Sequence, residues 1–559
     1  MNIDKEFNAI DPETIRQAAE QTSDPAAIFQ EALQKMPNDA GALYQSHVIE
    51  ALKTLRRKDE LAYTRLCAMA KGHVTRLDKL TAPERACRED NQLSSLIQDI
   101  SKDNTIGHDA NGRGIAVIDQ EGVRQVFYIN GTGFAEWFRA KYYAASGLGL
   151  SDQLLAIAVN TLSAIGMHEG NLLEVHMRCA KHSDKYFIDL CNKDWSAICV
   201  NEHGWTIVKH APVLFIRSRN MRALPMPLSA GDLSKLWQYI NIPAALHVLL
   251  MTWLIECYRT DTPFPPLELS GEQGSAKSTT QRRLRDLIDP NQVALRGRPK
   301  TVEDIYIAAA NNWIVSLENL SNLTPEQQDA FCTLATGGGH AARELYTNGD
   351  EYVLETKRPV IMNGINQVAT QPDLIERTIS IEAPTIAASD RLDEQTITTK
   401  WELDYAAVFT GVLDLFSKSL EILPTVVLDK KYRMADFQLL GEAVAQAMGH
   451  GVGHFTNVYG ASVSDGIGRS MENYGLANAM QLFMAERDYK QWEGTFLALK
   501  AELENLYGID KSNWPKSPRG LAGQLKRIGP GLRQAGIVIE PRGRSTNGSS
   551  IRITFSKSE

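Results

Sequence analysis

A lysine and a serine close a glycine-containing segment near the middle of the 559-residue chain. Residues 271–278 read Gly-Glu-Gln-Gly-Ser-Ala-Lys-Ser, one position away from the phosphate-binding pattern Gly-x-x-x-x-Gly-Lys-[Ser/Thr]. In that pattern, backbone N–H groups surround an anion at the start of a helix, the lysine reaches the β- and γ-phosphates, and the hydroxyl holds Mg²⁺. The spacing therefore predicts a site for ATP and Mg²⁺, formed by Gly271, Glu272, Gln273, Gly274, Ser275, Ala276, Lys277, Ser278 and Thr279.

The sequence on either side of this segment fits a phosphate-binding loop. Leu267 and Leu269 form a short apolar strand before it, and a basic helix that reaches Ile288 follows it. Ala276 stands where the pattern has its second glycine, and it carries a Cβ that such a loop normally lacks. Either the local backbone tolerates the alanine or phosphate binding is altered. An ordinary turn before a helix is the alternative interpretation, but the coincidence of strand, loop, Lys-Ser pair and helix favours the nucleotide site.

Polar side chains near the ends of two apolar strands follow the loop. The run Trp313–Asn319 contains Glu318 near its end, where a carboxylate holds Mg²⁺ through water. The run Pro359–Asn363 ends in Asn363, at the place of a sensor for the γ-phosphate. Each run alone fits an ordinary core strand, but their order behind the loop favours one nucleotide site.

Two further signals complete this order. Between the two strands, residues 343–357 predict a β-hairpin with a type I′ turn at Asn348-Gly349. After them, Pro372–Arg377 precedes a last strand, Thr378–Ile381.

Residues 266–384 resemble the AAA+ core of phage- and plasmid-type replicative helicases, close to superfamily 3 and to the helicase half of viral primase-helicases. The resemblance rests on the segments Gly-Glu-Gln-Gly-Ser-Ala-Lys-Ser-Thr, Val-Ser-Leu-Glu-Asn-Leu-Ser, Leu-Ala-Thr-Gly-Gly-Gly, Arg-Glu-Leu-Tyr-Thr-Asn-Gly-Asp-Glu, Arg-Pro-Val-Ile-Met-Asn and Asp-Leu-Ile-Glu-Arg. It implies an α/β P-loop NTPase core followed by a helical lid. The roles that it implies are phosphate binding for Lys277, Mg²⁺ binding for Ser278 and Glu318, a first sensor at Asn363, an arginine finger at Arg377 that reaches a neighbour's ATP, and a second sensor in the lid at Arg433. For Arg433, a surface arginine is the alternative.

Two positions depart from the family pattern. Asn319 stands where many relatives have a second acid that orients the attacking water, which leaves the rate of hydrolysis open. The predicted hairpin tip, residues 348–350, lacks the lysine or histidine expected of a loop that grips DNA in the pore of a ring. Arg343 and Lys357 lie at the base of this hairpin, so the pore contact either moves there or is absent.

Positive charge is concentrated at the end of the chain. Residues 511–559 carry ten Lys and Arg against two Glu, although the whole chain has a net charge of −8. A basic end on an acidic body suggests a polyanionic partner, with a merely solvated tail as the alternative. The pattern of helix, helix, strand, basic turn and strand predicts a winged helix whose DNA-contacting side chains are Arg519, Lys526, Arg527, Arg542 and Arg544. A winged helix used for protein contact is the other possibility.

The remaining sequence divides the chain into regions of different pattern. The expected divisions are an N-terminal helical region (1–108), an α+β domain (109–228), the ATPase core (229–385), a helical lid and linker (386–478) and the winged helix (479–559). The sequence begins without a basic and then apolar leader. The apolar stretch Ile240–Tyr258 is interrupted by polar residues, which favours a buried helix over a membrane span. We therefore expect a cytoplasmic protein without membrane contact.

Together these patterns predict an ATP-dependent DNA helicase or replication initiator of a phage or mobile genetic element. It would act on single-stranded or duplex DNA as a ring, the hexamer that the resemblance implies, and a separate primase would be needed because no zinc-type primase cysteines are present. The rival hypothesis is an ATP-gated DNA-binding switch or helicase loader, including a defence-type ATPase, that hydrolyses slowly and unwinds nothing. Asn319 favours the rival, and the ordered motifs favour the helicase.

Overall fold

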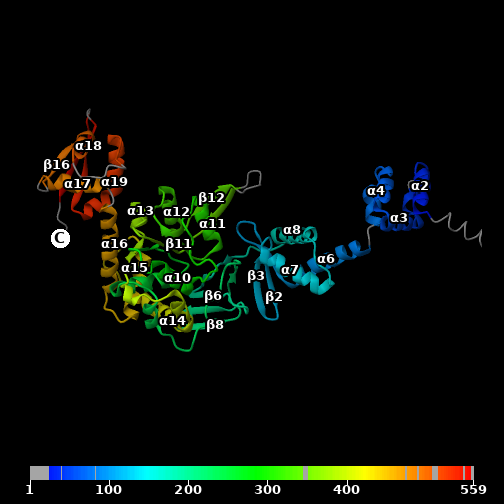
Figure 1. The fold of residues 1–559 in the computed structure, drawn as a ribbon, viewed down its shortest axis with the longest axis horizontal. Coiled ribbons are helices and arrows are strands. Elements are labelled where there is room, and N and C mark those ends of the chain that lie inside the picture. The colour runs from blue at the N-terminus through cyan, green and yellow to red at the C-terminus, as the bar shows by residue number, and fades with distance from the viewer. Residues whose placement is uncertain are drawn as a thin grey trace, which may run out of the picture. The chain divides into compact units, whose positions relative to one another are not determined.

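The computed structural model describes residues 24–555 apart from 40, 82–83, 344–350, 473–474, 488–489, 507–513 and 546–547. The chain divides into two units, whose helices and strands are labelled in Figure 1. One comprises Met1–Asp103 with Ala135–Leu162, and the other Asn104–Phe134 with Ser163–Glu559.

The first unit is helical. Its buried apolar side chains include Phe29, Leu43, Leu52 and Leu77, which explains why short amphipathic helices are stable here. The helices of the N-terminal segment are α2 (Pro25–Lys35), α3 (Ser46–Lys58), α4 (Glu60–Met69), α5 (Val74–Leu80) and α6 (Glu84–Asp103). Most of α7 (Thr132–Ser146) and α8 (Asp152–His168) also belongs to this unit.

Antiparallel strands open the second unit. A three-stranded sheet has the order β1-β2-β3, and a four-stranded sheet the order β5-β6-β7-β8. The bounds are β1 (Thr105–His108), β2 (Gly114–Gln120), β3 (Val123–Tyr128), β5 (Cys179–His182), β6 (Lys185–Asp189), β7 (Ala197–Asn201) and β8 (Gly204–Val208). A separate pair of short strands, β4 (Val175–His176) and β9 (Leu214–Phe215), is parallel.

A parallel sheet of order β11-β14-β10-β15 forms the centre of the second unit. Its strands are β10 (Leu267–Ser270), β11 (Val315–Leu320), β14 (Val360–Gly364) and β15 (Ile379–Glu382). Leu267 pairs with Ile361 on one side and Ile379 on the other. Because parallel strands are covered on both faces, they are apolar along almost their whole length, and the carboxyl ends of all four meet at one edge. The helices between them are α10 (Lys277–Ile288), α11 (Val302–Asn311), α12 (Pro325–Thr336) and α13 (Pro372–Ile375).

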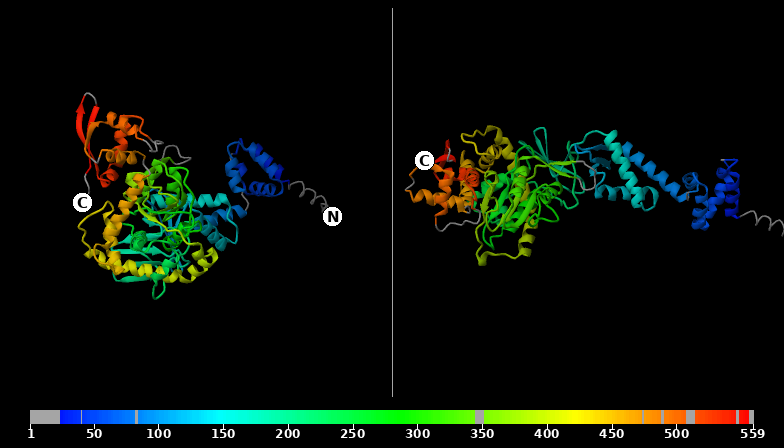
Figure 2. Two further views of the ribbon diagram at one scale, coloured as in Figure 1. Left: turned by 60° about the vertical axis from the view of Figure 1, so that its left-hand side comes forward. Right: turned by 90° about the horizontal axis from the view of Figure 1, so that it is seen from above.

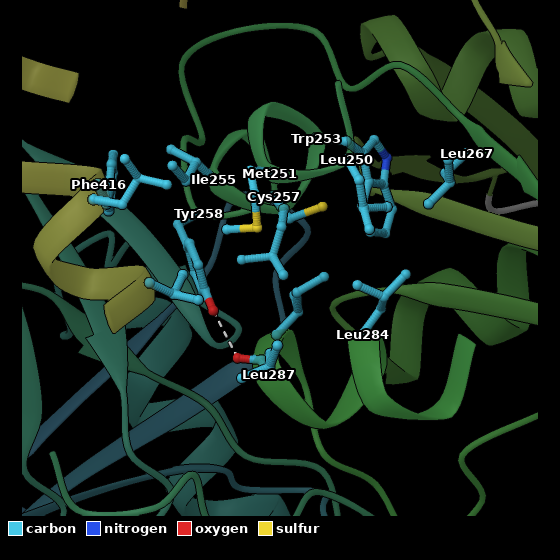
Figure 3. Packing of buried hydrophobic residues seen from close by; sticks show 14 of the residues in the cluster. Leu250, Met251, Trp253, Ile255, Cys257, Tyr258, Leu267, Leu284, Leu287 and Phe416 are labelled. Atoms are coloured by element: carbon cyan, nitrogen blue, oxygen red, sulfur yellow. Dashed lines mark hydrogen bonds between the residues drawn. The ribbon is translucent and has the colours of Figure 1, made fainter. Parts of the chain in front are cut away.

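The apolar stretch before β10 is buried, as the sequence predicts. It contains α9 (His247–Glu256), whose residues from Val248 onward are all buried. Figure 3 shows its Trp253 facing Leu267 and Leu284, while the hydroxyl of Tyr258 donates to the carbonyl of Leu287 at 2.6 Å. Among the helices of the described residues, none combines the length and the apolarity that crossing a membrane requires.

A buried charge pair joins the antiparallel strands to the end of α10. Arg178, which is 0% exposed, donates from Nε to Asp289 Oδ1 at 3.0 Å and from its two terminal nitrogens to the carbonyls of Asp189 and Arg222 at 2.8 and 2.9 Å. The second oxygen of Asp289 accepts from the backbone N–H of Trp313 at 3.1 Å. Both charges are thus removed from water and fully bonded, as buried charges must be.

Long helices follow the parallel sheet. They are α14 (Glu394–Ile422), α15 (Ala435–Ala447) and α16 (His454–Glu472), followed by α17 (Gly475–Ala485). Trp401 and Phe409 of α14 and Phe437 of α15 belong to the same buried cluster as Trp253. The helices α14, α15 and α16 lie within residues 386–478, the range in which the sequence predicts a helical lid and linker.

The C-terminal segment contains two helices and a three-stranded antiparallel sheet of order β16-β18-β17. Its elements are β16 (Trp492–Thr495), α18 (Phe496–Glu504), α19 (Pro518–Gln534), β17 (Ile537–Ser545) and β18 (Gly548–Phe555). The β17–β18 hairpin is drawn in red in Figure 2. The buried core of this C-terminal segment contains Leu499, Leu525, Leu532 and Ile553.

The predicted hairpin between β11 and β14 exists, but its register differs from the prediction. It consists of β12 (Gly339–Arg343) and β13 (Glu351–Glu355), and Arg343 pairs with Glu351. A two-residue turn at Asn348-Gly349 would instead pair Arg343 with Leu354. The predicted type I′ turn is therefore wrong in register, and the tip at residues 348–350 lies outside the described residues.

Candidate functional site

The segment between β10 and α10 forms an open loop with left-handed backbone. Gly271 and Gly274 have φ values of 140° and 84°, and Ala276 has φ 54° and ψ 29°. A Cβ on Gly271 would lie 2.6 Å from the carbonyl oxygen of Ala383, so this position requires glycine. No side chain caps the start of α10, and within the described part of the chain no N–H group of residues 272–278 donates to a carbonyl outside α10. Free N–H groups beside a left-handed residue at a helix start form an anion site, which fits the phosphates of a nucleotide.

Ala276 adopts the conformation that a glycine would take. The left-handed region costs an L-residue about 1–2 kcal/mol, and the alanine accepts this conformation without displacing the helix, which begins at Lys277. Of the two outcomes left open by the sequence, the structure shows that the backbone tolerates alanine.

Lys277 lies folded over the loop. Its ammonium group donates to the carbonyls of Gly271 and Glu272, both at 2.8 Å, and to the hydroxyl of Ser275 at 3.2 Å. Burial lowers the pKa of Lys277. Within the described residues, no carboxylate forms an ion pair with it, so the positive charge at the loop is uncompensated.

The strand that carries the predicted acid is tied to the neighbouring strand. Glu318 is partly exposed on β11, and its N–H donates to the carbonyl of Arg296 at 2.8 Å. Asn319 is exposed, has a left-handed φ of 54°, and donates from its N–H to Asn363 Oδ1 at 2.9 Å. Asn363 therefore fixes the peptide that follows Glu318.

Gln281 is a site residue that the sequence analysis missed. It is fully buried on α10, one turn after Lys277. Its amide nitrogen donates to Ser316 Oγ at 2.9 Å and to the carbonyl of Leu317 at 3.0 Å, and its oxygen accepts from Asn363 Nδ2 at 2.6 Å. A chain of hydrogen bonds thus joins α10, β11 and β14. The available signal was a glutamine on the apolar face of the helix that follows the loop.

Arg391 is a second residue that the sequence analysis missed. A Cβ added to Gly274 would lie 2.6 Å from Arg391 Nη2, so the guanidinium lies directly against the loop. The segment that carries it is held there, because Ile386 donates its N–H to the carbonyl of Gly274 at 3.4 Å and accepts from Arg391 Nε at 3.3 Å. Arg391 thus adds a second positive charge at this loop.

The structure places the predicted lid arginine and the predicted finger arginine at one shared carboxylate. Arg433 Nη1 pairs with Glu376 Oε2 at 2.6 Å, and its other terminal nitrogen pairs with Asp373. Arg377 also pairs with Asp373. In this structure the guanidinium of Arg433 is therefore held by acids of and beside α13, and its role as the second sensor stays a prediction.

The base of the β12–β13 hairpin is held inside the protein. Lys357 is partly buried, and its ammonium group donates to the carbonyl of Thr262 at 2.9 Å. Burial lowers the pKa of Lys357. The side chain of Arg343 lies outside the described residues. Of the two base residues, Lys357 is thus committed to an internal contact.

The predicted DNA-contacting residues lie on α19 and the β17–β18 hairpin. Arg519 and Lys526 of α19 and Arg542 of β17 are exposed. The side chains of Arg527 and Arg544 lie outside the described residues. Exposed cations on a helix and on a hairpin leave both DNA and protein partners open.

Sequence models of known protein families match two segments of this chain. Residues 233–467 match the sequence model of a family described as Actinomycete integrative conjugative element replication protein. Residues 476–559 match the C-terminal domain of the same replication protein, described as AICE RepA C-terminal domain. Both segments are similar to one replication-protein family. No curated protein sequence matches the chain.

Two solved structures are similar to this chain in fold. One is titled SCCmec type IV Cch, active helicase, with 12% sequence identity, coverage of 81% of this chain and 92% of the other, and a TM-score of 0.46. The other is the apo structure of the NrS-1 C-terminal region, with 11% identity, coverage of 83% and 98%, and a TM-score of 0.34.

Proposed function

We propose that this chain is an ATP-dependent DNA helicase or replication initiator of a mobile genetic element. It acts in the cytoplasm as a ring-shaped homo-oligomer, a hexamer, with an AAA+ core at residues 229–385. One observation carries the proposal: the phosphate loop, Asn363 and the Glu318-Asn319 pair lie at the carboxyl ends of three adjacent parallel strands, at one edge of the sheet. This edge is where open parallel sheets bind ligands.

The residues of this edge divide the work of ATP hydrolysis among them. The N–H groups of the loop bind phosphate, and Lys277 moves from the carbonyls of Gly271 and Glu272 to the β- and γ-phosphates. Ser278 and Glu318 hold Mg²⁺, which when bound neutralises the charge of the phosphates.

The surrounding side chains orient these groups. Asn319 positions the attacking water, and Asn363 holds Asn319 in place. Arg391, which lies against Gly274, contacts the nucleotide of its own subunit, as the sequence analysis expects of the second sensor Arg433. Arg377 serves the neighbouring subunit.

The C-terminal segment is, in this proposal, a winged helix that binds DNA. Arg519, Lys526 and Arg527 contact phosphates or the major groove from α19, while Arg542 and Arg544 contact DNA from the wing. Priming is left to a separate protein. The match of residues 476–559 to the C-terminal domain of a replication protein supports a replication role for this segment.

A slower ATP-gated switch or helicase loader is the second candidate. The observation in its favour is Asn319, since an amide beside Glu318 cannot accept a proton from the attacking water. Phosphoryl transfer depends mainly on positioning and charge, so this favours the second candidate only in part.

ATP turnover with and without single-stranded DNA, measured beside unwinding of a forked duplex, separates the two candidates. A helicase hydrolyses ATP faster with DNA and separates the fork, whereas a switch binds ATP and DNA without separating it. Lys277→Ala removes the ammonium group at the loop, and we expect it to abolish turnover while the circular dichroism spectrum is unchanged. Full turnover in a folded Lys277→Ala protein would exclude the nucleotide site at this loop.

A further inference from the structure

Two arginines from different parts of the chain share one carboxylate. Arg377 follows α13, and Arg433 precedes α15. Arg377 Nη1 pairs with Asp373 Oδ2 and also donates to the Asp373 carbonyl at 2.8 Å. Arg433 Nη2 pairs with the other oxygen, Oδ1, and Arg433 Nη1 pairs with Glu376 at 2.6 Å. Asp373 therefore binds both guanidinium groups, one through each carboxylate oxygen.

The two arginines differ in exposure. The side chain of Arg377 is 15% exposed, whereas those of Arg433 and Asp373 are 37% and 50% exposed. Burial would raise the pKa of Asp373, but the charges of Arg377 and Arg433 outweigh it and the pKa is lowered. Arg377 Nη1 is thus directed to the carbonyl and the carboxylate of Asp373 in its own subunit and not to a neighbouring subunit.

We propose that Asp373 holds Arg377 in a retracted position and that Arg433, by neutralising part of the charge of the same carboxylate, sets how easily Arg377 is released toward a neighbour. This rests on the proposed function, because it assigns Arg377 to a site in the adjacent subunit. When Arg377 leaves, Arg433 still neutralises Asp373, and no carboxylate is left without a partner. Partly exposed ion pairs contribute little to stability, so the exchange is reversible.

The position of Arg433 connects this exchange to the helical lid. Arg433 lies in the segment between α14 and α15. Arg391, at the nucleotide loop, lies just before α14. A movement of α14 and α15 that follows nucleotide binding therefore acts on both arginines. Asp373 and Arg433 are positioning residues in this scheme, since they act on the reaction only through Arg377.

The first test compares ATP turnover of single and double variants in assembled protein. Asp373→Asn keeps the shape of the side chain and removes its charge, so Arg377 is released and turnover rises about twofold to fivefold, the scale of an exposed ion pair. Arg433→Ala leaves Asp373 to Arg377 alone, and turnover falls by a similar factor. Since Arg433 acts through Asp373, the double variant turns over like Asp373→Asn. Reduced turnover in Asp373→Asn, or additive effects in the double variant, would overturn the proposal.

The second test places the same substitution in different subunits of a mixed assembly. Arg377→Ala subunits keep the phosphate loop but lack the finger, and Lys277→Ala subunits keep the finger but lack the loop lysine, so their mixture recovers part of the turnover. Asp373→Asn on the Lys277→Ala subunit raises the recovered turnover, because that subunit has a finger to release. On the Arg377→Ala subunit the same change has nothing to release and leaves the recovered turnover as it was.

The outcomes separate this proposal from the proposed function. Equal effects of Asp373→Asn on both subunit types would show that it acts by another route, and the retraction of Arg377 would be rejected while the ATPase stands. If the native protein has no turnover that Lys277→Ala abolishes, the proposed function itself fails.

Discussion

Asn319 is the single side chain on which the choice between a fast and a slow ATPase depends. Its backbone is held by Asn363 and is left-handed, with φ 54°. Asparagine and aspartate tolerate this region better than other non-glycine residues. Aspartate is therefore the acid that fits this position with the least backbone strain.

We expect Asn319→Asp to hydrolyse ATP faster than the native protein. The new carboxylate accepts a hydrogen bond from the attacking water, and such help is typically worth about 10²–10⁴-fold, although positioning and charge contribute more to phosphoryl transfer. Steady-state turnover with single-stranded DNA checks this, with Glu318→Gln as an inactive control. A slower Asn319→Asp protein would mean that Glu318 itself serves the water and that a second charge only repels the phosphates.

Ala276 provides a stability prediction at the same scale. Ala276→Gly removes a left-handed alanine that costs about 1–2 kcal/mol but adds the backbone entropy of glycine, about 0.5–1 kcal/mol. We expect a small net rise in the thermal unfolding midpoint. Ala310→Gly, in the last turn of α11, is the control and lowers the midpoint, because a right-handed helical alanine is lost. A fall in both variants would contradict the strain at Ala276.

At the scale of elements, the buried hydrogen bonds of Gln281 connect helix α10 to two strands of the parallel sheet. This residue contacts β11 through Ser316 and β14 through Asn363, so the three elements that carry the loop, the acid and the sensor are held in one arrangement. Buried polar networks of this kind fix geometry when every member is satisfied.

Gln281→Met keeps the size of the side chain and leaves Ser316 and Asn363 without their partner. We expect a loss of stability of about 1–3 kcal/mol, the penalty for unsatisfied buried groups. We also expect a larger fall in turnover than in ATP affinity, because Asn319 loses its orientation. Fluorescent-nucleotide titration and turnover separate the two effects, and Gln292→Met, at an exposed position, serves as the control. Equal losses of affinity and turnover would assign Gln281 to phosphate binding or to folding alone.

The sequence predicted the strands of the central sheet because each is a short apolar run with a polar residue near its end. It could not predict the hairpin register, since the Asn348-Gly349 dipeptide suggested a tight turn that the pairing of Arg343 with Glu351 excludes. It could not separate Arg391 from Arg433 either. Both flank lid helices, and only tertiary packing shows that Arg391 lies against Gly274 while Arg433 is bound by acids.

At the scale of the whole molecule, positive charge at one end is combined with an acidic remainder. The ten Lys and Arg of residues 511–559 exceed the two Glu there, and Arg519, Lys526 and Arg542 are exposed. Each phosphate contact releases counterions, which makes the affinity for DNA depend on salt.

Deletion of residues 480–559 is expected to weaken duplex DNA binding and to flatten its salt dependence. The slope of log affinity against log salt falls by about 0.9 for each phosphate contact that is lost. Fluorescence anisotropy at several salt concentrations measures the slope, and deletion of only residues 556–559 is the control. The same slope in the truncated and full-length proteins would place the DNA surface elsewhere.

The buried pair of Arg178 and Asp289 restricts how this chain can be divided or exchanged during evolution. The family match begins at residue 233. It contains Arg285, 3.9 Å from Asp289 Oδ2, but not Arg178, which donates a hydrogen bond to Asp289 Oδ1 at 3.0 Å. A hybrid gene product that joined a foreign leader to residues 229–559 would lose the hydrogen-bonded arginine and leave Asp289 only the more distant Arg285, a defect of up to about 3–5 kcal/mol. We therefore expect residues 104–559 to be inherited as a block. We expect a recombinant fragment of residues 104–559 to be monodisperse and to bind nucleotide. A fragment of residues 229–559 should aggregate unless Asp289 is replaced by asparagine.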